Sequence, residues 1–505
     1  MPLATPLHRP SPWALGRPLT LLPAHRRRPQ RDDQGPTRRH RPESSHRVLL
    51  VWSDRLPVRR QTPRPPFTGR PTGPRRRFRR VRRAPLLRSS LVRFPTGLRA
   101  FNHRDFRLFW TGQLVSLVGT WMQTVGQAWL VLELTNSPFK LGLITTLQFA
   151  PMLVFSFVAG AITDRLPKRR LVVATQTAML GQALVLAALT LSGHIRYWHI
   201  AVLATLYGVV NTMDQPARQS FIVEMTSKDD LLNAIALNSA VFNGTRVVGP
   251  AVAGLLIARF GVGVAFLLNS VSFVAVIAAL LAVRAQGLPR ARRGRSMREE
   301  IVEGIAYALR TPSIRLILGL LLVVSVFLLN YNVLVPLLAR QVLHEEAEGF
   351  GLLMAAVGLG AVGGAAALAG LGRGRPPLGA LVSAAVVLGL GTVSLSAVQH
   401  FWVAAAVLLM MGFSGIIFMA GSNTTLQVMV PDELRGRMMS LYMFVFSGVT
   451  PIGAFLLGSI TGAFGVPVGC LVSGTLGLLA IGGLAGWWRA RHWRGHALAE
   501  ARPPQ

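Results

Sequence analysis

The chain has 505 residues, of which 51% are hydrophobic and 15% are charged, and its formal net charge is +34. Soluble domains carry about 25% charged residues, so this composition excludes an ordinary soluble protein and indicates a membrane protein. The single cysteine, Cys470, excludes a disulfide framework and a thiolate metal site.

The first 100 residues differ from the rest in composition, because they hold 25 of the 54 basic residues, 4 of the 20 acidic ones and many prolines. Like charges and proline oppose packing, so residues 1–100 are predicted to be disordered. Three interpretations are open: the segment is a basic arm that lies on anionic lipid, it binds nucleic acid, or it is not part of the natural protein because the start codon has been assigned too early. The third interpretation, with a start near residues 81–92, is favoured because the next methionine, Met122, already lies in an apolar run. No nucleic-acid partner is expected.

From residue 101 onward, apolar runs of about 18–25 residues recur, the length with which a helix crosses about 30 Å of hydrocarbon. Twelve are predicted, centred near residues 120, 150, 181, 206, 245, 272, 325, 360, 388, 412, 448 and 476. The expected fold is an all-α membrane protein with twelve transmembrane helices in two six-helix halves, residues 101–283 and 314–490. A linker, residues 284–313, joins the halves, and residues 491–505 form a tail.

Basic residues are distributed unevenly between the loops on the two sides. One side carries 21 Lys and Arg residues, and the other carries only Lys140, Arg196, Arg259 and Arg340. Cytoplasmic loops are enriched in Lys and Arg, so both termini are expected in the cytoplasm. The second half of the linker, from Ser296, is predicted to form an amphipathic helix on the cytoplasmic surface.

The two halves carry traces of a repeat. Residues 229–231 (Asp-Asp-Leu) correspond to residues 432–434 (Asp-Glu-Leu), and each is followed by a helix that ends on a Phe-x-Gly motif. GRGRPP, residues 372–377, follows the eighth span where GAITDRLPKRR, residues 160–170, follows the second. Two parallel six-helix units with a site between them is a transporter architecture.

GAITDRLPKRR resembles the signature of the major facilitator superfamily between its second and third helices, although Pro167 replaces the usual glycine. Residues 121–151 and 214–224 are similar, more narrowly, to the branch of enterobactin exporters and drug-efflux proteins. The resemblance covers about residues 101–490. It implies a secondary transporter and not an enzyme, in the bacterial inner membrane, with no cofactor and no metal.

The resemblance also implies a conformational latch, with Asp164 at a helix end accepting bonds from the N-terminus of the eleventh span. Arg165 could pair with Asp229 or Glu224. The alternative is an ordinary basic turn that only sets orientation. A second hinge is expected at DQPAR in span 4, where a proton relay is the alternative. The predicted latch residues are Gly160, Asp164, Arg165, Lys168, Arg169, Asp214 and Arg218.

Gly249, Pro250 and Gly254 form a helix-bending motif in span 5. In the family such a motif is associated with exporters that work as antiporters, but Thr245 stands where a glycine is usual. The expected activity is export of a small amphipathic molecule by a monomer, in exchange for protons. An importer or uniporter is the alternative on this fold. A membrane-embedded enzyme is disfavoured because the histidines are far apart, and a membrane-embedded receptor because it would usually carry a sizeable soluble domain, which this sequence lacks.

Polar residues inside the spans are candidates for contact with the substrate. Arg246 either meets an anionic substrate or pairs across helices, and the second interpretation is favoured. The uncharged candidates could equally be helix–helix hydrogen bonds. Trp121, Trp129 and Trp198 are interpreted as interface anchors. The candidate cavity-lining residues are Gln123, Gln127, Gln148, Arg246, Asn330, Asn332, Asn423 and Gln427.

Overall fold

The computed structural model describes residues 95–287, 297–370 and 376–500, and every regular element in these ranges is a helix. The chain divides into two units, residues 1–84 and 85–505, and the described residues all belong to the second. The predictions of disorder and of a late start for residues 1–94 lie outside the described residues, as does the repeat motif at residues 372–375.

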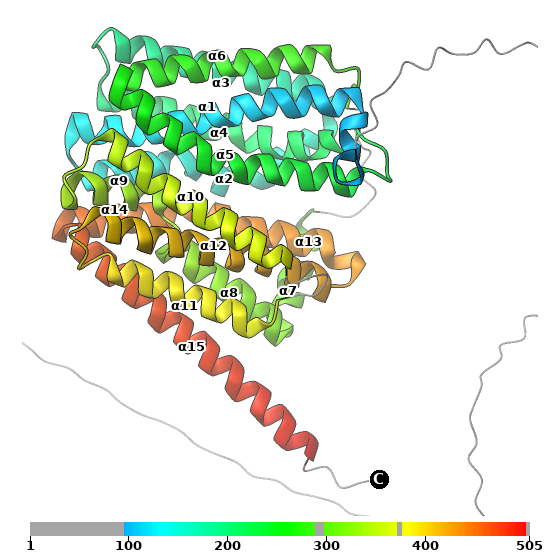
Figure 1. Ribbon diagram of the computed structural model, residues 1–505. Helices are drawn as coiled ribbons and strands as arrows, with labels where there is room; N and C mark the ends of the chain where they lie inside the picture. Colours follow the sequence, from blue (N-terminus) through cyan, green and yellow to red (C-terminus); the bar gives the residue numbers. More distant parts are fainter. Residues whose placement is uncertain (1–94, 288–296, 371–375, 501–505) are drawn as a thin grey trace, which may run out of the picture. The chain divides into compact units, whose positions relative to one another are not determined.

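The first half is a group of six long helices that begins with a short 3-10 helix, η1 (Thr96–Asn102) (Figure 1). The six are α1 (Arg104–Thr135), α2 (Pro138–Arg165), α3 (Lys168–Leu191), α4 (Tyr197–Ile222), α5 (Leu231–Phe260) and α6 (Val262–Ala282). The half begins before residue 101, the predicted boundary, because Asn233 in α5 binds the backbone of Gly97 and Ala100.

The linker helix α7 (Met297–Arg310) leads into the second half; its predicted cap, Ser296, lies outside the described residues. The second half contains α8 (Pro312–Phe327), α9 (Tyr331–Leu337), the π-helix η2 (Leu338–Val342), α10 (Ala347–Gly370), α11 (Leu378–Ser394), α12 (Phe401–Met429), α13 (Asp432–Met443), the π-helix η3 (Phe444–Gly448), α14 (Thr450–Phe464) and α15 (Val466–Glu500). α15 continues past residue 490, the predicted end of this half.

The predicted twelve crossings are confirmed. Each predicted centre falls within one helix, once α8, α9 and η2 are taken as one crossing and α13, η3 and α14 as another. In the described ranges, eight stretches are long and apolar enough to cross a membrane, and one of them contains both α5 and α6. α1, α4 and α11 are not among them: α11 has only 17 residues, and α1 and α4 carry charged residues and buried polar ones.

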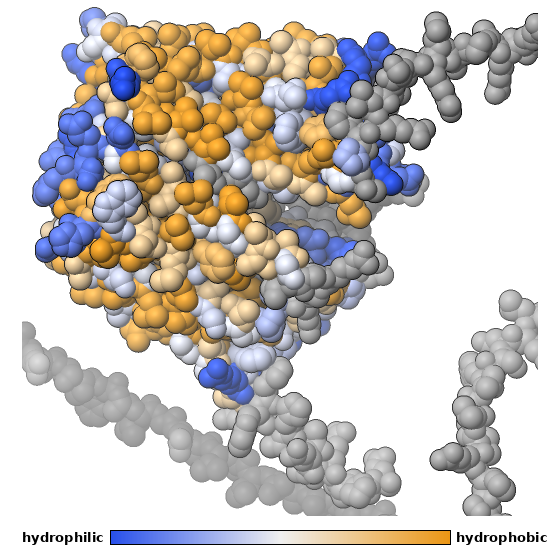
Figure 2. All heavy atoms as spheres, in the orientation of Figure 1, coloured by the Kyte–Doolittle hydropathy of each residue, from blue (hydrophilic) through white to orange (hydrophobic). Residues whose placement is uncertain are grey.

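The surface of the helices is apolar, as a bilayer demands. Large side chains such as Leu232 and Trp402 are 82% and 79% exposed. Figure 2 shows hydrophobic residues over much of one face and hydrophilic ones toward its ends. Buried positions, in contrast, include Gln123, Gln127 and Asp214. Polar groups therefore turn inward, where they can bind one another, and the apolar surface suits lipid.

Local sequence explains how the helices end. At the turn between α1 and α2, Asn136 adopts a left-handed conformation with φ of 43°, and the Ser137 hydroxyl accepts a bond from the Lys140 amide at 3.3 Å. Asn and Ser are the residue types that favour such caps, and proline suits the first helical position that Pro138 occupies. Gly261 and Gly465, with φ of 79° and 86° and ψ of 167° and 163°, end α5 and α14 in an extended conformation that is essentially restricted to glycine.

The halves meet closely where two pairs of glycines face each other. A Cβ atom on Gly254 of α5 would lie 2.7 Å from the Cα of Gly351 in α10, and one on Gly142 of α2 would lie 2.7 Å from the Cα of Gly458 in α14. Any side chain would force these backbones apart. Both pairs lie at the end of the helices away from the linker, hereafter the opposite end; the end that carries the linker is the linker end.

The two glycine pairs are related by the repeat of the halves. Gly142 and Gly351 each stand four residues after the first residue of their helix, and Gly254 and Gly458 each stand six residues before the last. Close to them, the Thr146 hydroxyl donates to the Pro451 carbonyl at 3.1 Å. The duplicated fold therefore brings the halves together at the opposite end through two equivalent contacts.

Candidate functional site

The turn between α2 and α3 is tied to its own half by Lys168. This side chain is only 1% exposed, and its ammonium lies 3.0 Å from the Glu224 carboxylate just beyond α4. Its backbone amide donates to the Gly287 carbonyl at 2.9 Å. Glu224, a predicted partner of Arg165, is thus paired with Lys168. Arg165 itself is exposed, and the side chains of Gly160 and Asp164 lie outside the described residues.

Arg169 binds the end of α6. Its Nε donates to the Leu280 carbonyl at 2.9 Å, and an NH2 group donates to the Leu281 carbonyl at 2.6 Å. A cation is favoured here, because the last carbonyls of a helix have no partner within the helix and carry partial negative charge. Lys168 and Arg169 therefore join the start of α3 to the ends of α4 and α6 at the linker end.

Asp214 lies fully buried in α4. Its carboxylate accepts hydrogen bonds from the Thr175 hydroxyl at 2.6 Å and the Gln176 amide at 3.0 Å, both from α3. The Arg218 guanidinium, one helical turn along, donates to the second carboxylate oxygen at 2.6 Å. The DQPAR motif thus forms a network between α3 and α4 within the first half.

A polar contact also fastens the start of the first half. His103, which precedes α1, lies 2.8 Å from the carboxylate of Asp230, which precedes α5. This hydrogen bond, helped by one from Ser227, holds the pKa of Asp230 below its usual value. Asp230 is therefore ionised at any physiological pH and a lasting acceptor for His103.

The predicted glutamines of α1 bind other helices of the first half. Gln123 donates to Gln182 of α3 at 3.1 Å and accepts a bond from Asn269 of α6 at 2.7 Å. Gln127 donates to Gln148 of α2 at 3.0 Å. Gln123 and Gln127 are both 5% exposed, so they hold helices together, while Gln148 is partly exposed.

Candidates in the second half are more scattered. Asn330 is buried and donates to the Val326 carbonyl at 2.7 Å, whereas Asn332 is partly exposed. Gln427 is exposed and donates to Asn423 one helical turn earlier at 2.5 Å. Asn330 stands at a break in the seventh crossing, where Leu328 to Asn330 separate α8 from α9.

Arg246 lies in the middle of the 30-residue α5. Its guanidinium carbon is 5.8 Å from the centre of the Trp121 ring of α1, and it interacts electrostatically with Tyr331 of α9 in the other half. Trp121 is thus not an interface anchor: α1 begins at Arg104, which places residue 121 in the middle of the helix. Gly249 makes room for this arrangement, since a Cβ there would lie 2.4 Å from the Trp121 Cβ.

Pro250 is buried inside α5, one residue after Gly249, and the helix continues through it to Phe260. Gly254 follows one turn later, at the contact with Gly351. The predicted helix-bending motif thus places Gly249 against α1 and Gly254 against the other half.

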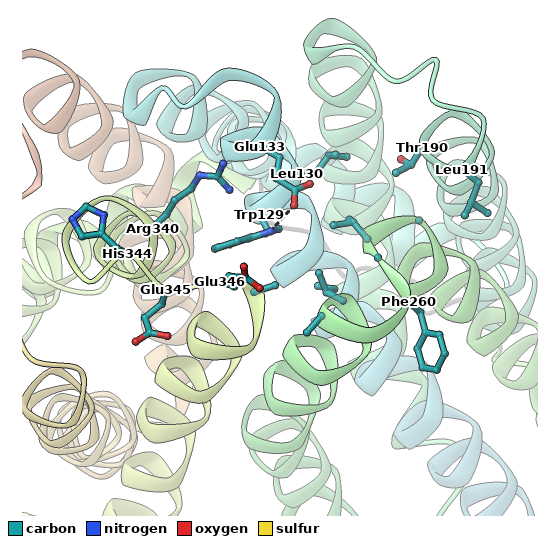
Figure 3. A pocket seen from close by; sticks show the side chains of 16 residues that line it. Trp129, Leu130, Glu133, Thr190, Leu191, Phe260, Arg340, His344, Glu345 and Glu346 are labelled. Carbon is teal, nitrogen blue, oxygen red and sulfur yellow. Dashed lines mark hydrogen bonds between the residues drawn. The ribbon is translucent and has the colours of Figure 1, made fainter.

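Sequence reasoning missed an aromatic stack at the opposite end. The Trp129 ring of α1 lies parallel to Phe350 of α10, with centres 5.9 Å apart, and Arg340 of η2 lies 5.2 Å from the centre of the Trp129 ring. Trp129 also donates to Glu133 at 2.7 Å (Figure 3). It is 5% exposed, so it joins the halves and does not anchor α1 in an interface. Only Trp198, which is 58% exposed, keeps that interpretation.

The stack borders an open pocket of about 790 Å³ at the opposite end, which is also lined by Glu345 and Glu346 (Figure 3). Among the described residues, no group of three or more His, Cys, Asp or Glu side chains is placed to hold a metal ion.

Comparison with known proteins identifies the family. The profile of the transmembrane secretion effector family, MFS_3, matches residues 95–502. The chain belongs to this family of the major facilitator superfamily. It is a multi-pass membrane protein and a secondary transporter of small molecules, and the transporters it resembles are not enzymes.

Curated relatives match over most of their length. The staphyloferrin A transporter of Staphylococcus aureus is 25% identical over 71% of this chain and 90% of its own. The multidrug efflux pump Tap of Mycolicibacterium fortuitum is 24% identical, over 70% and 88%. The enterobactin exporter EntS of Shigella boydii is 27% identical, over 75% and 90%.

Solved structures share the fold. The nucleoside transporter NupG matches with a TM-score of 0.63 and 8% identity, over 76% of this chain and 98% of its own. A bacterial homologue of the lysosomal transporter Spinster matches with a TM-score of 0.60 and 10% identity, over 76% and 95%.

Proposed function

We propose that this transporter moves a small amphipathic molecule out of the cell, across the cytoplasmic membrane, by alternating access. The observation that supports it most is the contact between the halves at the opposite end, through the two glycine pairs. Close backbone contact at one end of the helices suits two rigid bodies that rock against each other about a central site. The names of the relatives, an enterobactin exporter and a multidrug efflux pump, favour export over import.

The linker end faces the cytoplasm in this proposal. The loops at that end carry 21 Lys and Arg residues against four at the other, and Lys and Arg concentrate on the cytoplasmic side of membrane proteins. The opposite end, with its close glycine pairs and Trp129 stack, then faces outward.

Proton antiport is the energy source that we propose. No nucleotide-binding motif is present in the sequence, and the glycines at 358–364 lack the Gly-Lys-Ser/Thr of a phosphate loop. The motif of Gly249, Pro250 and Gly254 supports antiport through the family resemblance. Asp214, buried among its α3 partners, is the carboxylate that a proton relay through the first half would use.

Two experiments test this function. A deletion strain profiled for drug susceptibility and for siderophore secretion identifies the substrate, and everted vesicles then measure its uptake together with proton movement. We expect substrate uptake into everted vesicles that is coupled to proton release and absent without the protein. Uptake that moves no protons would remove antiport, and accumulation only in right-side-out vesicles would favour an importer.

A further inference from the structure

Arg246 lies in the middle of a membrane-spanning helix, where a charged side chain is energetically unfavourable. It stands halfway along α5, and no hydrogen bond or ion pair joins it to any residue whose side chain the structure describes. Its guanidinium lies over the face of the Trp121 ring and interacts electrostatically with Tyr331. A charge that is kept at this depth without a carboxylate calls for another source of negative charge.

Three carboxylates of the first half are engaged elsewhere. Asp214 is bound to Arg218, Glu224 lies against Lys168, and Glu133 accepts a bond from Trp129. These three lie in or beside α4 and α1, and none is within ion-pair distance of Arg246. The protein therefore does not neutralise this guanidinium with the side chains that the structure describes.

Arg246 faces the interior and not the lipid. Leu255 is 52% exposed on the outer surface of α5, and it follows Arg246 by nine residues, which is about two and a half helical turns. The two side chains therefore point in opposite directions. Arg246 is partly exposed, lies over the Trp121 ring of its own half and interacts electrostatically with Tyr331 of the other half, so its exposed part borders the space between the halves.

From this geometry we infer that Arg246 is the anion-binding group of the transport path and that the substrate is an organic anion. This inference rests on the proposed transport function and names its substrate class. The guanidinium binds a carboxylate or another oxyanion in a fork of two hydrogen bonds. The Trp121 ring lies against the guanidinium, and the Tyr331 hydroxyl, which donates to the Met411 carbonyl at 3.4 Å, interacts electrostatically with it from the other half.

Three probes that share one ring separate charge from shape: 1-naphthoate, 1-naphthamide and 1-naphthylmethylammonium. Full-length protein in a non-ionic detergent is dialysed to equilibrium against each. We expect the wild type to bind naphthoate about ten- to a hundredfold more tightly than naphthamide, the range of a charge-assisted hydrogen bond, and the cation least. Arg246→Gln should remove the preference, while Arg246→Lys should keep part of it.

Arg315→Gln is the matched control. Arg315 also places its guanidinium over a tryptophan, 3.9 Å from the Trp487 ring centre, but it lies in the first turn of α8 at the linker end. This variant should keep the full preference for naphthoate. A wild type that binds the three probes equally, or binds none of them, overturns the inference, as does an Arg246→Gln variant that still prefers the anion.

If Arg246→Gln elutes as an aggregate, the wild-type series and Arg246→Lys decide the question. Because binding is measured without transport, the anion preference can fail while vesicle export succeeds. Export can equally fail while the preference holds, so the two proposals are separately refutable.

Discussion

At the scale of the residue, the Asp214 carboxylate shows how a buried charge stabilises the first half. It is 0% exposed and accepts bonds from Thr175, Gln176 and Arg218. Asp214→Asn would place an amide NH2 group against these donors and leave Arg218 without its counter-charge. We expect a loss of about 3 kcal/mol in the free energy of unfolding. Thermal unfolding followed by size-exclusion chromatography measures it.

Thr175→Val is the control for Asp214, because it removes one neutral donor and should cost only about 1 kcal/mol. If Asp214→Asn is as stable as the wild type, the carboxylate does not hold α3 and α4 together. The proton-relay interpretation of DQPAR would then be favoured.

Asp164 carries the second prediction at this scale, which follows from the family resemblance. Asp164→Asn removes the charge that a helix N-terminus would stabilise, so we expect export to fall at least about tenfold while membrane insertion is unchanged. Vesicle export and the amount of protein in the membrane are measured together. Arg170→Gln, an exposed change in the same turn, should leave both unchanged. Normal export by Asp164→Asn would reduce GAITDRLPKRR to an orientation signal.

The sequence could not predict which residue each polar side chain of the site contacts. The glutamines of α1 were recognisable as polar groups in a membrane span, but the choice between a substrate contact and a helix contact depends on what faces them. Gln123 meets Asn269, which is 146 positions away, and only the packing of α1 against α6 brings the two together. The Trp129 stack was hidden for the same reason, since Phe350 and Arg340 belong to the other half.

At the scale of the element, the crossings were predictable because their length and apolar content follow from the thickness of a bilayer. The break between α8 and α9 was not, because neither proline nor glycine stands between Leu328 and Asn330. Its only local signal was the pair of asparagines at 330 and 332, residue types that compete for backbone hydrogen bonds. The 3-10 helix η1 was likewise missed beside the charged segment that precedes it.

Helix contact at the opposite end yields the third prediction. Gly254→Val would place side-chain atoms against the Gly351 backbone, so we expect α5 and α10 to separate and the opposite end to open. A cysteine at Ala347, which is 4% exposed and whose carbonyl borders Gly254, reports the opening. Replacing Cys470, the single cysteine, by alanine gives the background. A maleimide should then label Ala347→Cys several-fold faster when Gly254→Val is present.

Gly482→Val is the matched control for this test, because a Cβ at Gly482 meets open space. It should leave the labelling rate unchanged. An unchanged rate in Gly254→Val itself would mean that the glycine pair does not keep the opposite end closed.

At the scale of the whole molecule, the two six-helix halves could be predicted from the charge pattern and the repeat, and the family match agrees. The sequence did not reveal at which end the halves touch. That depends on small residues at equivalent places in helices of different halves, and a chain with 50 glycines offers many such places. Only the three-dimensional structure selects Gly142, Gly254, Gly351 and Gly458 from among them.

The last prediction follows from the proposed rocking of the halves and concerns a reversible disulfide that would hold them together at the opposite end. A Cβ on Gly462 of α14 would lie 3.1 Å from the Cβ of Phe139 in α2, near the separation of about 3.5–4.5 Å that a disulfide needs. With Cys470 replaced, the pair Phe139→Cys and Gly462→Cys should form a disulfide between the halves upon oxidation. We expect oxidation to stop export of the substrate that the deletion strain identifies, and a reductant to restore it, because alternating access requires the opposite end to open once in each cycle.

Each single-cysteine variant should be insensitive to oxidation. Full export by the oxidised pair, with the cross-link verified by electrophoresis, would show that the halves remain joined at this end during transport and would refute the rocking mechanism.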